Sequence, residues 1–210
     1  MISGFVRRVR DRYGEWRDGA LDRRYGIHTG GVITDMHLVC ITGQNGRHGN
    51  HYEPIQLRVF RRIMAALPLR PAEFSFIDFG SGKGRALLLA AQYGFRRVIG
   101  IEHARRLHEA AEQNVARFRS LSGAQTPIEL HCADALEWPL PTEDLVCFLY
   151  NPFDAILTAR LMASMRASLE AMPRRLYVAY RNPQHPEALD NSGFLRCLAR
   201  NSTFAIFTAR

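Results

Sequence analysis

Three glycines spaced two residues apart, Gly80, Gly82 and Gly84, most constrain how this 210-residue chain can fold. They follow a short apolar and aromatic run, residues 74–79, that is typical of a buried strand. They precede an alanine- and leucine-rich run, residues 86–91, that is typical of the start of a helix. Glycines let a backbone turn with positive φ and approach a ligand closely, and a helix N-terminus offers unpaired N–H groups. The sequence therefore predicts a strand, a glycine turn and a helix that together bind an anion or a nucleotide.

Strand-like and helix-like segments alternate along the rest of the chain. The strand-like runs are residues 97–102, 128–132, 144–150, 176–180, 194–198 and 203–208, and the helix-like runs are residues 104–118 and 154–172. Alternation favours parallel strands joined by helical crossovers, whereas the short connection between the last two runs favours an antiparallel pair. The predicted fold class is α/β: a doubly wound, mostly parallel seven-stranded sheet with an antiparallel C-terminal strand and an N-terminal helical extension.

The first quarter of the chain has a different pattern. Apolar residues recur every three or four positions in residues 2–16 between arginines. This predicts a basic amphipathic helix that packs on the domain or acts as a lid or membrane-surface element. Residues 25–52 are glycine-rich and lack periodicity, and a loop this long is unusual unless it is functional or mobile. A helix is predicted next, at residues 55–67. We therefore divide the chain into a basic helical extension with a glycine-rich cap loop, residues 1–55, and a core domain, residues 56–210.

The glycine-rich loop contains side chains that could bind a metal ion. They are His28, His37, Cys40, His48 and His51. Their spacing fits no standard zinc finger, and histidines are common in polar loops beside ligand pockets. We therefore predict no metal site, and we expect the four dispersed cysteines of the chain to be buried free thiols.

The formal net charge of +8 lies mainly in the N-terminal third, where residues 1–70 hold twelve arginines against six acidic residues. A basic surface there could attract RNA, an acidic protein or an anionic membrane, although a solvated helix face is the commoner explanation. No apolar run approaches the ~18 residues of a membrane span. Arg7 and Arg8 follow the first residues too closely for a secretory signal. We therefore expect a cytoplasmic protein with no membrane span and with nucleic acid as one possible partner.

Acidic and amide side chains stand at the ends of several predicted strands. Asp78 lies in the first strand, Glu102 ends the second, Asp134 follows the third and Asn151 follows the fourth. In a doubly wound sheet, ligands bind at the carboxyl ends of the strands, where the strand order reverses. Each of these side chains alone could cap a helix or shape a turn. Together they predict one cleft, beside the glycine turn.

Three common motifs do not fit the glycine turn. The dinucleotide-binding fingerprint would place Arg85 where close helix packing needs a small residue. A Walker loop fails because Gly84 follows Lys83 where serine or threonine is required, and because Ile77 stands in place of the first glycine. The nucleophile elbow is absent, because Ser81 has a glycine directly on each side.

The pattern Asp78-x-Gly80-x-Gly82-x-Gly84 resembles that of class I S-adenosylmethionine-dependent methyltransferases, from about residue 52 to the end of the chain. The resemblance implies that the glycine turn lies against the methionine part of the cofactor. It also implies that Glu102 binds both ribose hydroxyls and that an acid, here Asp134, accepts a hydrogen bond from the adenine amine. A carboxylate suits a neutral diol and a nearby sulfonium cation. The predicted cofactor-binding residues are Asp78, Phe79, Gly80, Ser81, Gly82, Gly84, Glu102, Asp134 and Asn151.

The stretch after the fourth predicted strand, Tyr150-Asn151-Pro152-Phe153, resembles the Asn/Asp-Pro-Pro-Tyr/Phe motif of amino-group methyltransferases, with the second proline missing. It is also similar to Dot1-like and related seven-strand protein-lysine methyltransferases. These resemblances imply methyl transfer to an amino nitrogen of a protein side chain or a small molecule. A nucleic-acid base methyltransferase and a cofactor-binding module without catalysis are the alternatives. The candidate catalytic residues are Asn151, Pro152 and Phe153, together with Tyr52 and Glu53, which could deprotonate or orient the amine or cover the cofactor.

Overall fold

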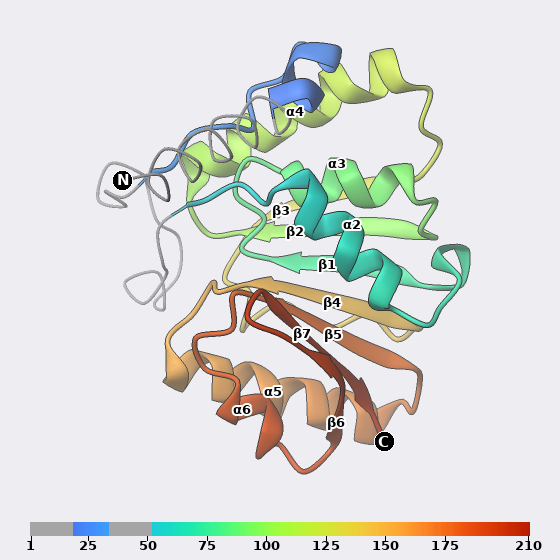
Figure 1. The fold of residues 1–210 in the computed structure, drawn as a ribbon, viewed down its shortest axis with the longest axis vertical. Helices are drawn as coiled ribbons and strands as arrows, with labels where there is room; N and C mark the ends of the chain where they lie inside the picture. Colours follow the sequence, from blue (N-terminus) through green and yellow to red (C-terminus); the bar gives the residue numbers. More distant parts are fainter. Residues whose placement is uncertain (1–18, 34–51) are drawn as a thin grey trace, which may run out of the picture.

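The computed structural model of the protein describes residues 19–33 and 52–210, and within them seven strands form one mixed sheet (Figure 1). The strands are β1 (Ser75–Phe79), β2 (Arg97–Glu102), β3 (Ile128–Cys132), β4 (Leu145–Tyr150), β5 (Leu176–Arg181), β6 (Leu195–Arg200) and β7 (Phe204–Ala209). Their order is β3-β2-β1-β4-β5-β7-β6. The first five are parallel, and β7 pairs antiparallel with both β5 and β6. The predicted fold class is confirmed.

Helices cover both faces of this sheet. The helices α2 (Leu57–Ala66), α3 (Arg85–Gln92) and α4 (Arg105–Ser122) pack on one face, and α5 (Ala155–Ala171) and α6 (Glu187–Asp190) pack on the other (Figure 1). Alternate residues of the central strands therefore enter two separate apolar clusters. Phe76 of β1 packs with the helices of the first face, and Ile77 packs with α5. Because both faces are covered, β1 is buried along its whole length, as expected for a central parallel strand.

The boundaries of the helices follow from local sequence. The side chain of Asp154 accepts a hydrogen bond from the backbone N–H of Leu157 at 2.9 Å and so caps the start of α5. Gly123 ends α4 with φ of 65°, a left-handed conformation that glycine adopts without strain. No helix joins β3 to β4, because Asp134 and the residues after it form a turn that carries cleft residues instead.

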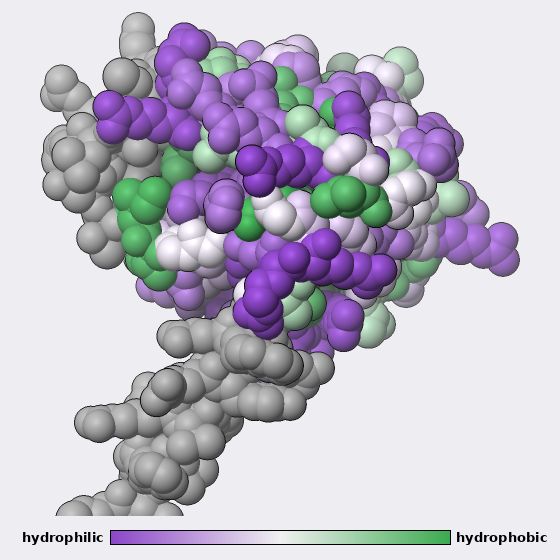
Figure 2. Space-filling model, turned by 90° about the horizontal axis from the view of Figure 1, so that it is seen from above, coloured by the Kyte–Doolittle hydropathy of each residue, from purple (hydrophilic) through white to green (hydrophobic). Residues whose placement is uncertain are grey.

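The N-terminal part that the structure describes packs on the same face as α2, α3 and α4. Residues 19–25 are helical, and Leu21, Tyr25 and Ile27 belong to the apolar cluster of that face. The rings of Tyr25 and Phe118 meet edge to face, with centroids 4.9 Å apart. Figure 2 shows the molecule from above, where the outer surface is mainly hydrophilic with separate apolar patches. The amphipathic helix predicted at residues 2–16 and most of the glycine-rich loop lie outside the described residues, so the division at residue 55 stays a prediction.

The expectation for the cysteines was only partly correct. In the described part of the chain Cys132, Cys147 and Cys197 are all free thiols, but only Cys147 is buried, and Cys197 is exposed. Cys197 lies on β6, which pairs only with β7 within residues 19–33 and 52–210 and so forms an edge of the described sheet. None of the helices within residues 19–33 and 52–210 combines the length and apolar character that crossing a membrane requires.

Phe60 gives a direct test of the packing between α2 and the sheet. Its fully buried ring meets the rings of Phe76 and Phe148 at centroid distances of 6.0 and 6.1 Å. Removing it leaves a cavity, so Phe60→Ala should lower the free energy of unfolding by about 3–5 kcal/mol. Urea denaturation followed by circular dichroism measures this loss. The control Ile156→Ala, at a side chain that is 69% exposed, should change stability by less than about 0.5 kcal/mol.

Candidate active site

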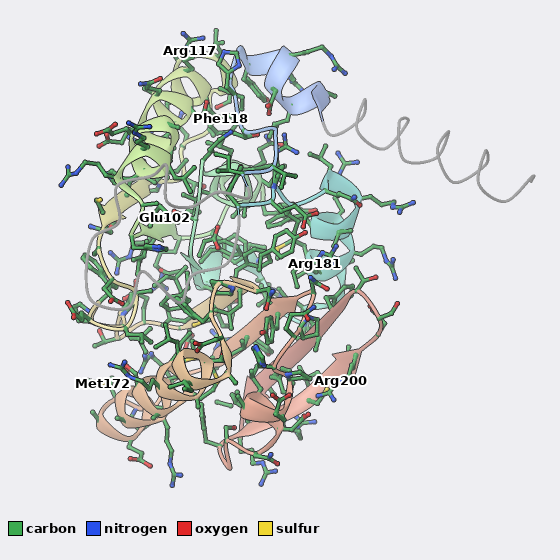
Figure 3. All side chains as sticks on the ribbon, turned by 90° about the vertical axis from the view of Figure 1, so that its left-hand side faces the viewer. Glu102, Arg117, Phe118, Met172, Arg181 and Arg200 are labelled. Atoms are coloured by element: carbon green, nitrogen blue, oxygen red, sulfur yellow. The ribbon has the colours of Figure 1, made fainter. Side chains whose placement is uncertain are left out.

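A cleft opens at the carboxyl ends of the parallel strands, where β1 lies between β2 and β4 and the strand order reverses. Figure 3 looks at this side of the molecule and shows Glu102 on the side of α4 and Arg181 at the end of β5. The structure brings most of the predicted site residues together in the lining of the cleft. They are Tyr52, Glu53, Asp78, Gly80, Ser81, Glu102, Asp134, Asn151, Pro152 and Phe153.

The glycine turn has the backbone conformation that the sequence predicts. Gly80, Gly82 and Gly84 have φ of 85°, 54° and 86°, in the left-handed region where other residues are strained. A Cβ atom at Gly80 would lie 3.1 Å from the Cβ of Pro152, and one at Gly82 would collide with the ring of Tyr52. Glycine is therefore needed at both positions, because of the backbone conformation and because Pro152 and Tyr52 occupy the space that a side chain would take.

Glu102 connects the glycine turn to the start of α4. Its Oε2 accepts a hydrogen bond from the backbone N–H of Gly82 at 2.7 Å, and its Oε1 accepts from Ala104 at 2.8 Å. The side chain is 4% exposed and lines the cleft. A carboxylate has about four acceptor positions, so two backbone donors leave capacity for hydroxyl groups of a ligand.

Asp78 lies at the carboxyl end of β1, 3% exposed and in the lining of the same cleft. Burial, together with the negative charge of Glu102, holds the pKa of Asp78 well above its usual value. Two carboxyl groups in one buried place disfavour ionisation of both, and a bound cation would relieve this repulsion. This end of the cleft is therefore suited to a positively charged ligand group.

Three predicted cofactor residues are absent from the lining of the cleft. The side chain of Phe79 is fully buried in the apolar cluster on the α5 face. Gly84 begins α3, and a Cβ there would lie 3.4 Å from the side chain of Ala111 in α4. Gly82 lies behind the ring of Tyr52. These glycines shape the turn and its packing; direct contacts of Phe79, Gly82 and Gly84 with the cofactor stay predictions.

Asp134 lies in the turn after β3. It is 7% exposed, lines the cleft with Ala133 and Ala135, and its Oδ1 accepts from the backbone N–H of Leu136 at 3.0 Å. Apolar neighbours beside one acidic acceptor suit a flat ring that carries an amino group, as the predicted adenine contact requires.

Tyr52 covers one end of the glycine turn. Its hydroxyl donates to the backbone carbonyl of Thr29 at 2.7 Å, and burial raises the pKa of Tyr52 well above its usual value. A buried, protonated phenol that already donates its proton to a carbonyl cannot accept a proton from an amine at neutral pH. Of the roles predicted for Tyr52, the structure therefore disfavours deprotonation and favours covering the cofactor.

The residues after β4 form another part of the cleft lining. Asn151 has φ of 46°, a left-handed conformation that is uncommon outside glycine and that asparagine tolerates best. Pro152 follows it in the lining, and Phe153 lines the cleft with its ring anchored in the apolar cluster on the α5 face. Tyr150 precedes them, hydrogen-bonded to Glu53, and burial raises its pKa well above its usual value.

Sequence reasoning missed several residues of the cleft. Arg85 and His103 line it, together with Ile55, Ile101 and Leu107. The apolar members carry no distinguishing pattern, because they look like any buried strand or helix residue. Arg85 did carry a signal: an arginine directly after a glycine turn, at a position that packs closely, needs a buried acidic partner. That partner, Asp22, is 63 residues away in the sequence.

Comparison with known protein families identifies the domain that contains this cleft. Residues 76–177 match the family model described as "Methyltransferase domain", and this range holds the glycine turn, Glu102, Asp134 and Asn151. Residues 76–177 form a class I S-adenosylmethionine-dependent methyltransferase domain. The domain binds S-adenosylmethionine as its cofactor.

Solved structures share the fold of this methyltransferase at low sequence identity. A protein from Pseudomonas syringae assigned as a methyltransferase is 16% identical, with a TM-score of 0.53 over 72% of this chain and 96% of that one. The ribosomal protein L11 methylase from Lactobacillus delbrueckii subsp. bulgaricus is 14% identical, with a TM-score of 0.50 over 73% and 77% of the two chains. A SAM-dependent methyltransferase from Aquifex aeolicus is 14% identical, with a TM-score of 0.50 over 71% and 88%.

A search of curated protein sequences finds no significant match. The comparisons confirm the resemblance to class I methyltransferases but do not specifically support its Dot1-like branch, which stays a prediction.

The residues of the cleft fit S-adenosylmethionine. The buried pair of Asp78 and Glu102 suits a ligand that carries a sulfonium and an ammonium group. Glu102 has acceptor capacity for a diol, and Asp134 lines the cleft between two alanines. Gly80 lines the cleft without a side chain, so its backbone is close to the space of a bound ligand. We therefore expect Asp78 and the turn to hold the methionine end, Glu102 the ribose and Asp134 the adenine.

Asp78→Asn should separate the stability of the protein from its affinity for the cofactor. The pKa of Asp78 is higher in the folded protein than in the unfolded chain, so the unfolded chain loses this proton first, as the pH rises above about 4. The free energy of unfolding therefore falls as the pH rises from about 4 to the pKa of Asp78 in the folded protein. The neutral variant avoids this loss, so its melting temperature should exceed that of the wild type at pH 8 and match it at low pH.

The affinity of the Asp78→Asn variant for the cofactor should be lower than that of the wild type, whereas its stability at pH 8 should be higher. S-adenosylmethionine favours the ionised carboxylate, so wild-type affinity should rise with pH in the same window, whereas the affinity of the variant should be weaker and independent of pH there. Calorimetric titrations at several pH values measure this. Equal pH dependence in both proteins would contradict a raised pKa at Asp78.

Proposed function

We propose that this methyltransferase moves a methyl group from S-adenosylmethionine to an amino nitrogen of a protein side chain or a small molecule. The charge of the cleft supports an amine. Its lining contains the acidic residues Glu53, Asp78, Glu102 and Asp134, whereas its one arginine, Arg85, is paired with Asp22. An amine, neutral or protonated, is attracted to such a lining, and a phosphate group is repelled by it.

The observation that carries the proposal is the position of Asn151. It stands in a left-handed conformation at the end of β4 and lines the cleft between Tyr150 and Pro152. A non-glycine residue in this conformation costs of order 1–3 kcal/mol, and such residues concentrate at functional sites. An asparagine held there can accept hydrogen bonds from an amino group through its side-chain carbonyl, while the ring of Phe153 limits how the acceptor can turn.

The chemistry then depends on positioning. When bound, S-adenosylmethionine supplies an electrophilic methyl group, whose bond to sulfur breaks as the acceptor nitrogen forms the new bond to carbon. Asn151 and Phe153 orient the amine, and the cap that includes Tyr52 keeps water from the sulfur end. A lysine acceptor must first lose a proton, at a cost of about 4–5 kcal/mol at pH 7 for a pKa near 10.4. Glu53, which lines the cleft and is hydrogen-bonded to Tyr150, offers a carboxylate that could hold the ammonium group before that loss.

Asn151→Gly should reduce methyl transfer by about 100-fold, because glycine keeps the left-handed backbone but removes the amide that orients the acceptor. Affinity for S-adenosylhomocysteine should stay within a few-fold of that of the wild type. The matched control is Asn182→Gly, since Asn182 is also left-handed, with φ of 50°, but lies after β5 outside the cleft lining. Initial rates with labelled cofactor measure both variants, and equal losses in the two would contradict the role of Asn151.

The acceptor class is tested directly by incubating lysate from a strain that lacks the gene with the purified protein and methyl-labelled cofactor. The proposal expects label in protein or in small amines, and loss of that label with Asn151→Gly. Label in RNA or DNA would replace the proposal with the nucleic-acid alternative. Tight cofactor binding with no transfer to any fraction would favour a binding module without catalysis.

One observation favours the nucleic-acid alternative. Arg58, Arg61 and Arg62 lie exposed on one side of α2, which has no acidic residue of its own, and none of them forms an ion pair within the described residues. Ile55, two residues before α2, lines the cleft, so a polyanion could lie beside the mouth. Binding of RNA that weakens steeply with salt, and less steeply after Arg58, Arg61 and Arg62 are changed to glutamine, would support this alternative.

A further inference from the structure

A segment near the N-terminus, residues 22–30, lies against the start of α3; we refer to it as the strap. Two cations that flank Gly84 hold it in place. The Nζ of Lys83 donates to the backbone carbonyl of Gly30 at 2.8 Å, and the Nε of Arg85 donates to the Oγ1 of Thr29 at 2.7 Å. Thr29 is fully buried by this contact.

Asp22 completes the attachment from within the strap. Its carboxylate accepts hydrogen bonds from the backbone N–H groups of Thr29 and Gly30 at 2.8 and 3.0 Å, and from the hydroxyl of Thr29 at 2.6 Å. It also forms an ion pair with the Nη2 of Arg85 at 3.3 Å, and the arginine is only 4% exposed.

A second set of hydrogen bonds joins the strap to α4. The side chain of Asn114, which is 3% exposed, accepts from the backbone N–H of His28 at 2.8 Å and donates to the carbonyl of Lys83 at 3.0 Å. One amide therefore holds the strap and the glycine turn at a fixed distance from each other.

The strap in turn fixes Tyr52 over the cofactor turn. The hydroxyl of Tyr52 donates to the carbonyl of Thr29, and its ring occupies the space that a side chain at residue 82 would need. The ammonium group of Lys83 lies 5.1 Å from the centre of the same ring. Thr29 thus contacts Arg85 through its side chain and Tyr52 through its backbone.

We propose that Arg85 is a positioning residue for the cofactor: through Thr29 it holds the strap, the strap holds Tyr52 against the glycine turn, and this cover slows release of the bound cofactor. The inference goes beyond the transfer reaction, because it concerns the cofactor and is independent of the acceptor. Opening the cover requires breaking the contact between Arg85 and Thr29, so weakening that contact increases the rate of dissociation.

The test uses the purified full chain and a matched pair of variants. Thr29→Val keeps the size of the side chain and removes its hydroxyl, whereas Thr29→Ser keeps the hydroxyl. Labelled S-adenosylmethionine is bound, an excess of unlabelled S-adenosylhomocysteine is added, and the release of label is followed. Dissociation should be at least about tenfold faster in Thr29→Val, because the lost hydroxyl accepts a hydrogen bond from Arg85 and donates one to Asp22, and within about twofold of wild type in Thr29→Ser.

Ser75→Ala controls for a general loss of stability. Ser75 is also fully buried, and its hydroxyl donates to Glu143 at 2.8 Å, but it lies at the opposite end of β1 from the cleft. This variant should be less stable than the wild type and release the cofactor at the wild-type rate. If Ser75→Ala accelerates release as much as Thr29→Val, or if Thr29→Val releases the cofactor at the wild-type rate, the proposal is wrong.

Lys83 provides a second measurement that does not depend on transfer, because it is the only lysine of the chain. An amine-reactive ester followed by mass spectrometry of the peptide that contains Lys83 reports how often its ammonium group leaves Gly30. Labelling should be several-fold faster in Thr29→Val than in the wild type or Thr29→Ser, and bound S-adenosylhomocysteine should slow it in all three proteins. Equal labelling of wild type and Thr29→Val would overturn the proposal.

Discussion

The carboxylate of Glu102 is the contact on which the rest of the site depends. It ends β2, beside the point where the strand order reverses, and accepts from the N–H groups of Gly82 and Ala104. One side chain therefore fixes the glycine turn after β1 and the start of α4 relative to each other. The turn in turn sets where α3 begins, and with it the positions of Lys83 and Arg85 that hold the strap. A neutral side chain in place of Glu102 would not present a charged acceptor to the backbone N–H groups of Gly82 and Ala104.

The same arrangement costs stability before the cofactor binds. Asp78 and Glu102 are both buried beside the cleft, and the raised pKa of Asp78 reflects the free energy that it costs to ionise this carboxyl group there. Natural proteins retain such groups where function requires them, and here the requirement is a ligand with positive charge on sulfur and nitrogen. The buried apolar clusters on the two faces of the sheet supply the stability that allows this unfavourable pair.

The order and type of elements could be predicted because each β-rich run is short and the helical periodicity between the runs is clear. The site residues at strand ends, such as Glu102 and Asp134, could be predicted because a parallel sheet brings its carboxyl ends to one edge. The contacts of Arg85 could not, since its partners Asp22 and Thr29 lie more than fifty residues away in the sequence. Glycine spacing likewise could not distinguish Gly80, which borders the cleft, from Gly84, which packs on α4.

The strap also bears on how the chain should be divided. A boundary near residue 55 separates two sequence patterns, but in the described residues the packing continues across it. Leu21, Tyr25 and Ile27 share an apolar cluster with α2, α3 and α4, and burying side chains of this size contributes about 1.5–3 kcal/mol each. The ion pair of Asp22 with Arg85 would also lose its acidic partner if the segment were removed, leaving a buried charge unpaired. Within the residues that the structure describes, the N-terminal segment therefore packs as one unit with the core domain, although none of residues 19–33 lines the cleft.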